Sequence, residues 1–225
     1  MYADRFKPLL SSQERKVFQS LRTPQKIQDF LDTLPINFEE TKEGVLSPRR
    51  VLREKKAHCL EGALFAAASL AYHGYLPLLM DFRTLPIDED HVVAIFKQDG
   101  LWGAISKTNH AILRWRDPVY KSIRELAMSY FHEYLLWNGK KSLLAYSGAF
   151  DLRRYDPQWI IAEEELEWIA EDLDDARHYP IAPKAAMRRL RRGLPIERKA
   201  MELVEWNGKK RIPYTMHTHK KENSH

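Results

Sequence analysis

The chain has 225 residues and a mass of 26.5 kDa, with 44% hydrophobic, 30% charged and 11% aromatic residues. This composition excludes a wholly disordered chain and a collagen-like repeat, and a single cysteine excludes a disulfide scaffold. The net charge of +5 arises from 36 basic and 31 acidic residues, a near balance that does not by itself identify an anionic partner. We therefore expect a globular protein with one domain and appended helices, or two small domains.

The N-terminal segment MYADRFKPLL is charged and lacks the long apolar core of a secretory signal, so we expect a cytoplasmic protein. The longest stretch without a formal charge, residues 62–80, approaches the roughly 20 residues that span a bilayer. It contains polar residues and a proline, and we interpret it as a buried helix followed by a strand. We expect neither a membrane span nor a membrane partner.

Helix-start signals recur in the N-terminal quarter of the chain. Ser11 and Glu14 have the spacing of a capping box, and the pairs Thr23-Pro24 and Ser47-Pro48 each place proline directly after an N-cap residue. These signals predict two short helices before residue 35 and a third from Ser47, with a loop over residues 38–45.

The strongest helix signal begins at Cys59. Apolar residues recur at spacings of three and four, and Gly74 lies where a C-terminal cap is expected. The alanine-rich face suits close packing against a sheet. The repeating apolar positions are Leu60, Ala63, Leu64, Ala67, Leu70 and Ala71.

Strand patterns follow this helix. The turn Gln98-Asp99-Gly100 between the second and third candidates predicts an antiparallel hairpin. A fourth candidate extends the sheet before Asp117-Pro118 breaks it. The four candidates cover residues 75–82, 91–96, 101–106 and 111–115.

Beyond the strands, an amphipathic helix is predicted from Ser122 until Asn138-Gly139. Charges then segregate, because residues 163–175 contain eight acidic side chains and no basic one, whereas residues 184–199 contain seven basic and one acidic. The two segments could pair with each other within the chain.

These elements predict an α+β fold, in which N-terminal helices precede a long Cys-headed helix packed on an antiparallel sheet, followed by C-terminal helices. We divide the chain into a core over residues 1–145, a helical extension over residues 146–212 and a mobile basic tail over residues 213–225.

Cys59 lies in the first turn of the predicted helix. Unsatisfied backbone N–H groups and the helix dipole favour an anion there, so we expect the thiol pKa to fall below about 8.5. Lys55, Lys56 and His58 precede the thiol and add positive potential. The alternative is a small apolar residue packed beneath the sheet, as free cysteines often are.

His91 follows an acidic turn and begins an apolar strand, a position at the mouth of a cleft. If the N-terminus of the Cys59 helix packs at this mouth, the imidazole can accept the thiol proton and deliver it to a leaving amine. The alternative is a histidine that merely ends a surface turn.

A third residue is expected to orient the imidazole through its other nitrogen. Folding the hairpin brings Ser106 opposite His91, with Asn109 just beyond, and an asparagine oxygen can accept a hydrogen bond from the ring. We rank Asn109 first, Ser106 second and Asp117 third. Each of them could instead be ordinary turn or strand-edge polarity.

At this point the chain resembles the core of the transglutaminase-like superfamily of papain-like thiol enzymes. In that family a cysteine heads a helix, a histidine starts a strand, and an aspartate follows a tryptophan on the next strand. Cys59, His91 and Trp102 match these positions, but Ser106 stands where the family has the aspartate. The resemblance covers about residues 24–110 and is carried by the segments HCLEGALFAAASLAYHGY, PLLMDF, EDHVVAIF and GLWGAISK.

The residues and this resemblance predict a cysteine-dependent acyl-transfer enzyme acting on an amide or peptide substrate, as a hydrolase or a transamidase. Because serine cannot stabilise an imidazolium as a carboxylate does, the alternative is a catalytically weakened scaffold that binds a protein or peptide. We expect no cofactor, since no phosphate loop or dinucleotide fingerprint is present. The oligomeric state is left open.

Two further signals are weaker. His217, His219 and His225 could bind a metal loosely, although alternate histidines in a polar terminus are usually solvated, and we expect no metal site. The segment MRRLRRG, residues 187–193, could contact nucleic acid, but such arginines more often form a solvated helix face. We therefore do not expect a nucleic-acid partner.

Overall fold

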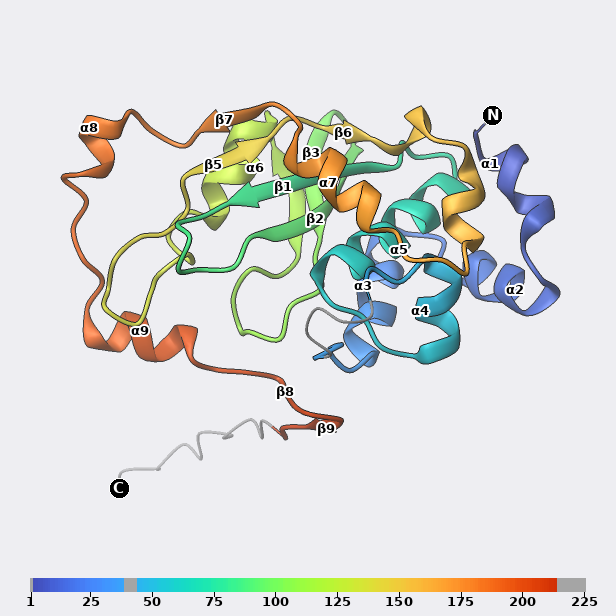
Figure 1. The fold of residues 1–225 in the computed structure, drawn as a ribbon, viewed down its shortest axis with the longest axis horizontal. Helices are drawn as coiled ribbons and strands as arrows, with labels where there is room; N and C mark the ends of the chain where they lie inside the picture. Colours follow the sequence, from blue (N-terminus) through green and yellow to red (C-terminus); the bar gives the residue numbers. More distant parts are fainter. Residues whose placement is uncertain (1, 39–43, 214–225) are drawn as a thin grey trace, which may run out of the picture.

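The computed structural model describes residues 2–38 and 44–213. It has the predicted α+β class. N-terminal helices and a central helix cover one side of an antiparallel sheet, and the C-terminal segment runs along the outside (Figure 1). The metal-binding possibility at His217, His219 and His225 lies outside the described residues.

The N-terminal helices start where the sequence predicts. The Ser11 hydroxyl accepts the Glu14 N–H in a complete capping box, and Thr23 and Ser47 cap the next two helices through their side chains. The elements are α1 (Tyr2–Phe6), the short 3-10 turn η1 (Lys7–Leu9), α2 (Ser12–Ser20), α3 (Pro24–Thr33) and α4 (Pro48–Glu54).

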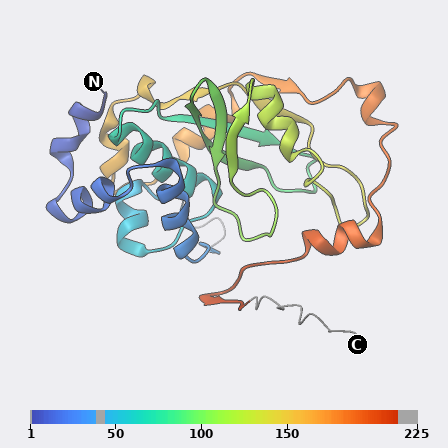
Figure 2. The same ribbon diagram turned by 180° about the vertical axis from the view of Figure 1, so that it is seen from behind.

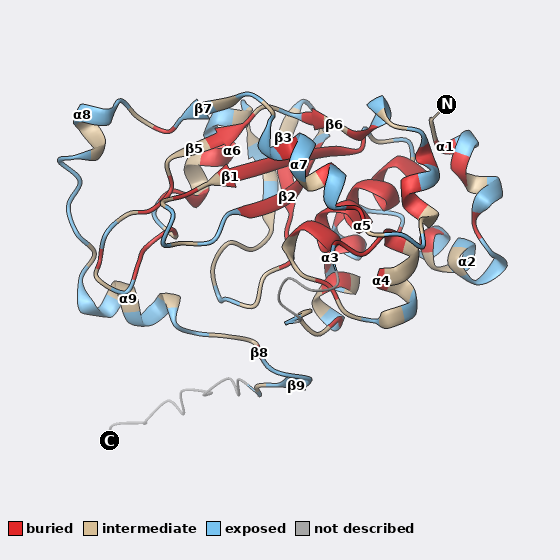
Figure 3. Ribbon diagram, in the orientation of Figure 1, coloured by how far each residue is buried: buried red, intermediate tan, exposed pale blue. Residues whose placement is uncertain are grey.

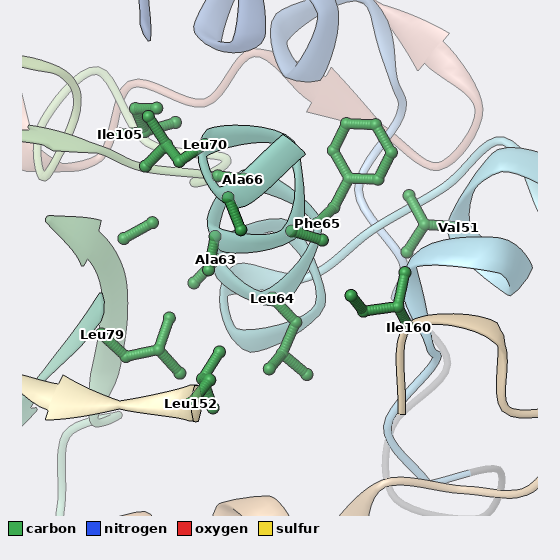
Figure 4. Close-up of a cluster of buried hydrophobic side chains, with 14 of the residues drawn as sticks. Val51, Ala63, Leu64, Phe65, Ala66, Leu70, Leu79, Ile105, Leu152 and Ile160 are labelled. Carbon is green, nitrogen blue, oxygen red and sulfur yellow. The ribbon is translucent and has the colours of Figure 1, made fainter. Parts of the chain in front are cut away.

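Helix α5 (Cys59–Tyr72) is the centre of the fold and is buried from Leu60 to its end (Figure 3). Figure 4 shows its small and branched side chains between the sheet, represented by Leu79, and the N-terminal helices, represented by Val51. Gly74 has a φ of +90°, the left-handed conformation expected of a residue that ends a helix. No described helix is long and apolar enough to cross a membrane.

The main sheet has the strand order β4-β3-β2-β1-β5-β7, with β6 also paired to β1. The predicted hairpin is present: Gln98 pairs with Leu101, and the two turn residues, Asp99 and Gly100, both have positive φ as a two-residue hairpin requires. Its first strands are β1 (Leu78–Arg83), β2 (His91–Gln98), β3 (Leu101–Ile105) and β4 (Arg116–Tyr120).

Strand β4 corrects the prediction for residues 111–115, because it begins at Arg116 and contains Asp117-Pro118 instead of ending there. It lies at the edge of the sheet, where the missing N–H of Pro118 can face outward without loss of a ladder hydrogen bond. Helix α6 (Ile123–Tyr130) is also shorter than predicted, although Tyr134 and Leu135 beyond it remain buried.

The two faces of the sheet are covered by different elements. On β2, Val92 and Ala94 belong to the core shared with α5, whereas Val93 and Ile95 belong to the core shared with α6. This is the alternation expected of a strand buried on both sides. Residues that pair across neighbouring strands share a face. His91 therefore lies on the α6 face with its partner Phe82, whereas Asp81 lies on the α5 face with its partner Val92.

Residues 146–212 contain strands as well as the predicted helices. Three short strands join the main sheet, and the remaining elements run outside it (Figure 2). Strands of two or three residues show no detectable period in a sequence. The elements are β5 (Ala145–Ser147), β6 (Phe150–Asp151), η2 (Leu152–Arg154), η3 (Pro157–Ile161), α7 (Glu167–Asp174), β7 (His178–Pro180), α8 (Lys184–Met187), α9 (Pro195–Met201), β8 (Trp206–Asn207) and β9 (Lys210–Arg211).

Candidate functional site

Cys59 is the first residue of α5, and the turn that carries it is tightly bonded. The His58 ring accepts the N–H of Leu60 through Nδ1 at 3.2 Å, and the buried Glu61 carboxylate accepts the N–H of His58 at 2.8 Å. Glu61 also accepts the N–H of Leu46 at 3.1 Å. The nucleophile candidate is therefore held in one backbone conformation by a capping network.

The thiol itself is shifted in the direction opposite to the prediction. Cys59 keeps some solvent exposure, but burial among protein atoms raises its pKa to about 11. The backbone N–H groups of Val92 and Leu60 lower the pKa, and the negative charges of Asp81 and Glu61 raise it again. Desolvation thus outweighs the helix terminus, and the thiol is neutral at neutral pH.

His91 is buried at the start of β2 and is bonded to Ser106. The ring Nε2 and the Ser106 Oγ are 2.8 Å apart, and Ser106 Oγ donates to the carbonyl oxygen of Leu113 at 2.5 Å. A serine hydroxyl has one hydrogen, which Leu113 takes, so Ser106 must accept a hydrogen from His91 Nε2. The neutral ring then carries its lone pair on Nδ1.

The free nitrogen of His91 is available for chemistry. Among the described residues, the ring contacts the Ser106 hydroxyl and the Leu113 carbonyl; a carbonyl accepts only from a ring N–H, so the lone pair of Nδ1 stays unused in this tautomer. Burial lowers the pKa of His91 to about 4, so the ring is neutral at neutral pH. No hydrogen bond joins Cys59 to His91 among the described residues. Burial raises the pKa of the thiol and lowers that of the imidazole, so both groups are neutral before a reaction starts.

The acceptor of the Ser106 hydrogen is held in a strained loop. Leu113 has a φ of +58°, a left-handed conformation that branched residues rarely adopt. Its N–H donates to Glu133 at 2.6 Å, and Glu133 pairs with Arg116 at 2.6 Å. These bonds hold the Leu113 carbonyl toward Ser106, and backbone strain of this kind is concentrated at functional sites.

The three candidates for the residue that orients the His91 imidazole have different partners in the structure. Asn109 is engaged elsewhere, donating to the Trp206 carbonyl at 3.1 Å and accepting the Trp206 N–H at 2.7 Å. Asp117 accepts the indole N–H of Trp115 at 2.9 Å. Ser106 is the candidate that the structure brings to His91.

Ser106 is itself fixed by residues that the sequence analysis did not single out. The Gln28 amide accepts the N–H of Ser106 at 2.9 Å and donates to its carbonyl at 2.8 Å. Next to it, the buried Lys107 donates to the Leu31 carbonyl at 2.9 Å, and burial lowers its pKa to about 8. The sequence signal for this contact is Gln28 itself, a polar residue between the buried apolar positions Ile27 and Leu31 of α3.

A second histidine, His178, is bonded to Asp81, whose negative charge acts on the Cys59 thiol. His178 Nε2 is 2.8 Å from an oxygen of Asp81, its Nδ1 donates to the Ala176 carbonyl at 2.7 Å, and both side chains are almost fully buried. Burial raises the pKa of Asp81 to about 6. Both ring nitrogens of His178 are occupied, so this ring cannot accept the thiol proton as placed.

The acidic and basic segments of the C-terminal half do not neutralise each other among the described residues. Glu163 pairs with Arg53 at 2.6 Å and Glu165 pairs with Arg50, so the acidic segment is bound to α4. The arginines of residues 188–192 are exposed. The described residues contain no group of three or more His, Cys, Asp or Glu side chains that could hold a metal ion.

The fold is similar to that of a solved structure, whereas the sequence matches no family model. No protein-family model and no curated protein matches the chain. A structure of Legionella pneumophila LapG, treated with EGTA, covers 70% of this chain and 91% of its own, with 12% sequence identity and a TM-score of 0.37. Similarity at this level carries no argument about activity, which rests on the residues described above.

Proposed function

We propose that the protein is a cysteine-dependent acyl-transfer enzyme that acts on amide or peptide carbonyls. The observation that carries this proposal is the hydrogen-bond chain from His91 through Ser106 to the Leu113 carbonyl, which leaves Nδ1 as a base. Cys59, at the head of α5, is the nucleophile that this base would serve. The sequence resemblance to transglutaminase-like enzymes supports the same assignment.

The proton is transferred during the attack in this proposal, because neither group is charged beforehand. As the Cys59 sulfur bonds to the substrate carbonyl carbon, His91 Nδ1 takes the thiol proton, and the C=O electron pair moves to oxygen. Collapse of this intermediate expels the amine, which receives the proton from His91. Water or a second amine then attacks the thioester and regenerates the thiol.

Ser106 gives the imidazolium a hydroxyl oxygen where a carboxylate would give a negative charge. The developing positive charge is therefore stabilised less, and we expect slower turnover than a carboxylate would allow. Asp81 does not fill this role, since it is bonded to His178. Backbone N–H groups at the start of α5, including that of Cys59, are candidate donors to the substrate oxygen.

Acetylation by p-nitrophenyl acetate tests the proposal. We expect a burst of p-nitrophenolate from the folded protein, with the acetyl group mapped to Cys59 by peptide mass spectrometry and no burst from Cys59→Ala. The same chain unfolded in urea is the matched control for intrinsic thiol reactivity. Acetylation of the folded protein that is slower than that of the unfolded chain would contradict catalysis.

Two observations support a second candidate function: the raised pKa of Cys59, and Ser106 in the place of a carboxylate beside His91. These features also suit a scaffold that binds a protein or peptide at the same site without turnover. A folded protein whose thiol fails to acetylate, yet which retains peptides from a random peptide library, would establish this function in place of acyl transfer.

A further inference from the structure

The chain beyond α9 returns to the loop that connects β3 to β4 (Figure 1). Residues 203–212, here called the C-terminal strap, pair with residues 106–115, the β3–β4 loop. The N–H of Ala111 donates to the Leu203 carbonyl at 2.9 Å, and the neighbouring pair of residues forms an antiparallel bridge. The strap is therefore docked on the loop as a short added strand.

Asn109 makes the most specific contacts between the loop and the strap. Its side chain accepts the N–H of Trp206 at 2.7 Å and donates to the Trp206 carbonyl at 3.1 Å. Its backbone carbonyl accepts the N–H of Glu205 at 2.7 Å, and the Glu205 carboxylate is bonded to Arg114 at 2.7 Å. Because Arg114 follows Leu113 directly, the strap binds the loop on both sides of Leu113.

The conformation of the β3–β4 loop matters because it places the Leu113 carbonyl, which takes the Ser106 hydrogen. The positive φ of Leu113 is costly for a branched residue and persists only where the surrounding structure imposes it. One support is Glu133, which accepts the Leu113 N–H, and another is the Tyr130 hydroxyl, which donates to the Arg114 carbonyl at 3.0 Å. These residues hold the second half of the loop, and the C-terminal strap holds the first half.

We propose that the C-terminal strap is a positioning element of the active site, and that Asn109 acts on His91 through it. With the strap docked, the Leu113 carbonyl takes the Ser106 hydrogen, and the ring keeps its own hydrogen on Nε2. With the strap released, Leu113 relaxes and the Ser106 hydroxyl donates to Nε2 instead. The ring hydrogen then lies on Nδ1, which no longer accepts the thiol proton. This inference rests on the proposed acyl transfer and gives Asn109 an indirect part in orienting the imidazole.

The docked strap contains a weak point that makes its release accessible. The indole N–H of Trp206 is buried and has no hydrogen-bond partner among the described residues, which opposes docking. The favourable side of the contact is the Trp206 ring, whose centroid lies 6.0 Å from the buried Lys107 ammonium group. Loss of the two side-chain bonds of Asn109 should therefore be enough to free the strap.

The variant Asn109→Ala tests the inference, since it removes both side-chain bonds to Trp206. We expect acetylation of Cys59 by p-nitrophenyl acetate, followed by peptide mass spectrometry, to slow about tenfold. The reason is that the Ser106 hydrogen bond then favours the ring tautomer that cannot accept a proton. Nitrogen NMR of the His91 ring, which does not depend on activity, should show its hydrogen on Nδ1 in place of Nε2.

A disulfide between strap and loop separates positioning from a general loss of stability. His110 and Val204 are bridge partners that do not bond each other, an arrangement with Cα atoms about 4.5 Å apart that suits a disulfide. Adding His110→Cys and Val204→Cys to Asn109→Ala should restore the acetylation rate to within twofold of the parent protein after oxidation, but not after reduction. Asn138→Ala is the matched control, because this asparagine caps a turn by accepting the Lys140 N–H, and it should acetylate at the parent rate.

Two results would overturn the proposal. One is an unchanged acetylation rate or an unchanged ring tautomer in Asn109→Ala, and the other is a slowed rate that the oxidised disulfide does not restore. A parent protein that fails to acetylate would instead overturn the proposed function. The ring tautomer in Asn109→Ala would then still decide whether the strap positions His91.

Discussion

His91 and His178 are two buried histidines at the same end of one sheet, and their bonding differs in the one respect that matters for catalysis. His91 lies on the α6 face, donates from Nε2 to Ser106, and leaves Nδ1 free. His178 is bonded through both nitrogens, to Asp81 and to Ala176, on the face that Asp81 shares with α5.

The comparison shows that a nearby carboxylate is not sufficient to make a catalytic histidine. The Asp81–His178 pair has the partner that a thiol enzyme usually requires, but its hydrogen bonds are complete and it joins β1 to β7. The His91–Ser106 pair lacks a carboxylate but retains an unused lone pair. In the proposed mechanism the first pair contributes stability and the second transfers the proton.

The largest expected effect comes from His91→Gln. Removing the base should slow acetylation of Cys59 by about 10² to 10⁴-fold, the usual contribution of general-base catalysis. His178→Leu, measured per folded molecule, should keep most of the activity. Burst kinetics with both variants would decide the assignment, and the reverse ranking would transfer the catalytic role to His178.

The next effect is on stability and concerns the other pair. His178→Leu leaves Asp81 buried without its partner, and we expect a loss of about 3–5 kcal/mol in the free energy of unfolding. The folded-state pKa of Asp81, already raised to about 6, then rises further above its unfolded value. A raised folded pKa gives stability that disappears as pH increases, so the loss should be larger above pH 6 than in mild acid.

The double variant Asp81→Leu with His178→Leu tests whether the stability lost in His178→Leu comes from the unpaired charge of Asp81. Replacing both members of a buried pair by apolar groups removes the uncompensated charge, so the double variant should unfold at higher urea concentration than His178→Leu alone. Equal midpoints for the single and double variants would mean that Asp81 carries no unpaired charge after the loss of His178.

The smallest expected effect comes from Ser106→Ala. The variant removes one neutral hydrogen bond to His91, which contributes about 1 kcal/mol, and should slow acetylation about fivefold. The Leu113 carbonyl near the ring can partly replace the hydroxyl as acceptor for Nε2–H. A loss as large as that of His91→Gln would show that Ser106 takes a direct part in proton transfer.

The sequence predicts those parts of this arrangement that depend on local patterns. The caps at Ser11 and Ser47, the helix that begins at Cys59 and the hairpin turn at Asp99-Gly100 all follow from residue types and short spacings. The proximity of Ser106 to His91 follows from the same hairpin, although the sequence favoured Asn109 over Ser106 as the partner of the imidazole.

Other features depend on contacts between distant parts of the chain. Asp81 and His178 are 97 positions apart and meet through strands too short to recognise, and Gln28 reaches Ser106 from a separate helix. The direction of the Cys59 pKa shift could not be predicted either. The helix terminus is visible in the sequence, but the burial that outweighs it is a property of the packed fold.

The pH dependence of Cys59 acetylation in the parent protein tests most directly whether a neutral imidazole activates a neutral thiol. His91 loses its proton near pH 4, and Cys59 keeps its own until about pH 11. The acetylation rate should therefore increase around pH 4, as His91 loses its proton, and remain constant across the neutral range. A rate that instead increases in proportion to hydroxide concentration throughout this range would show an unassisted thiolate and contradict the role of His91.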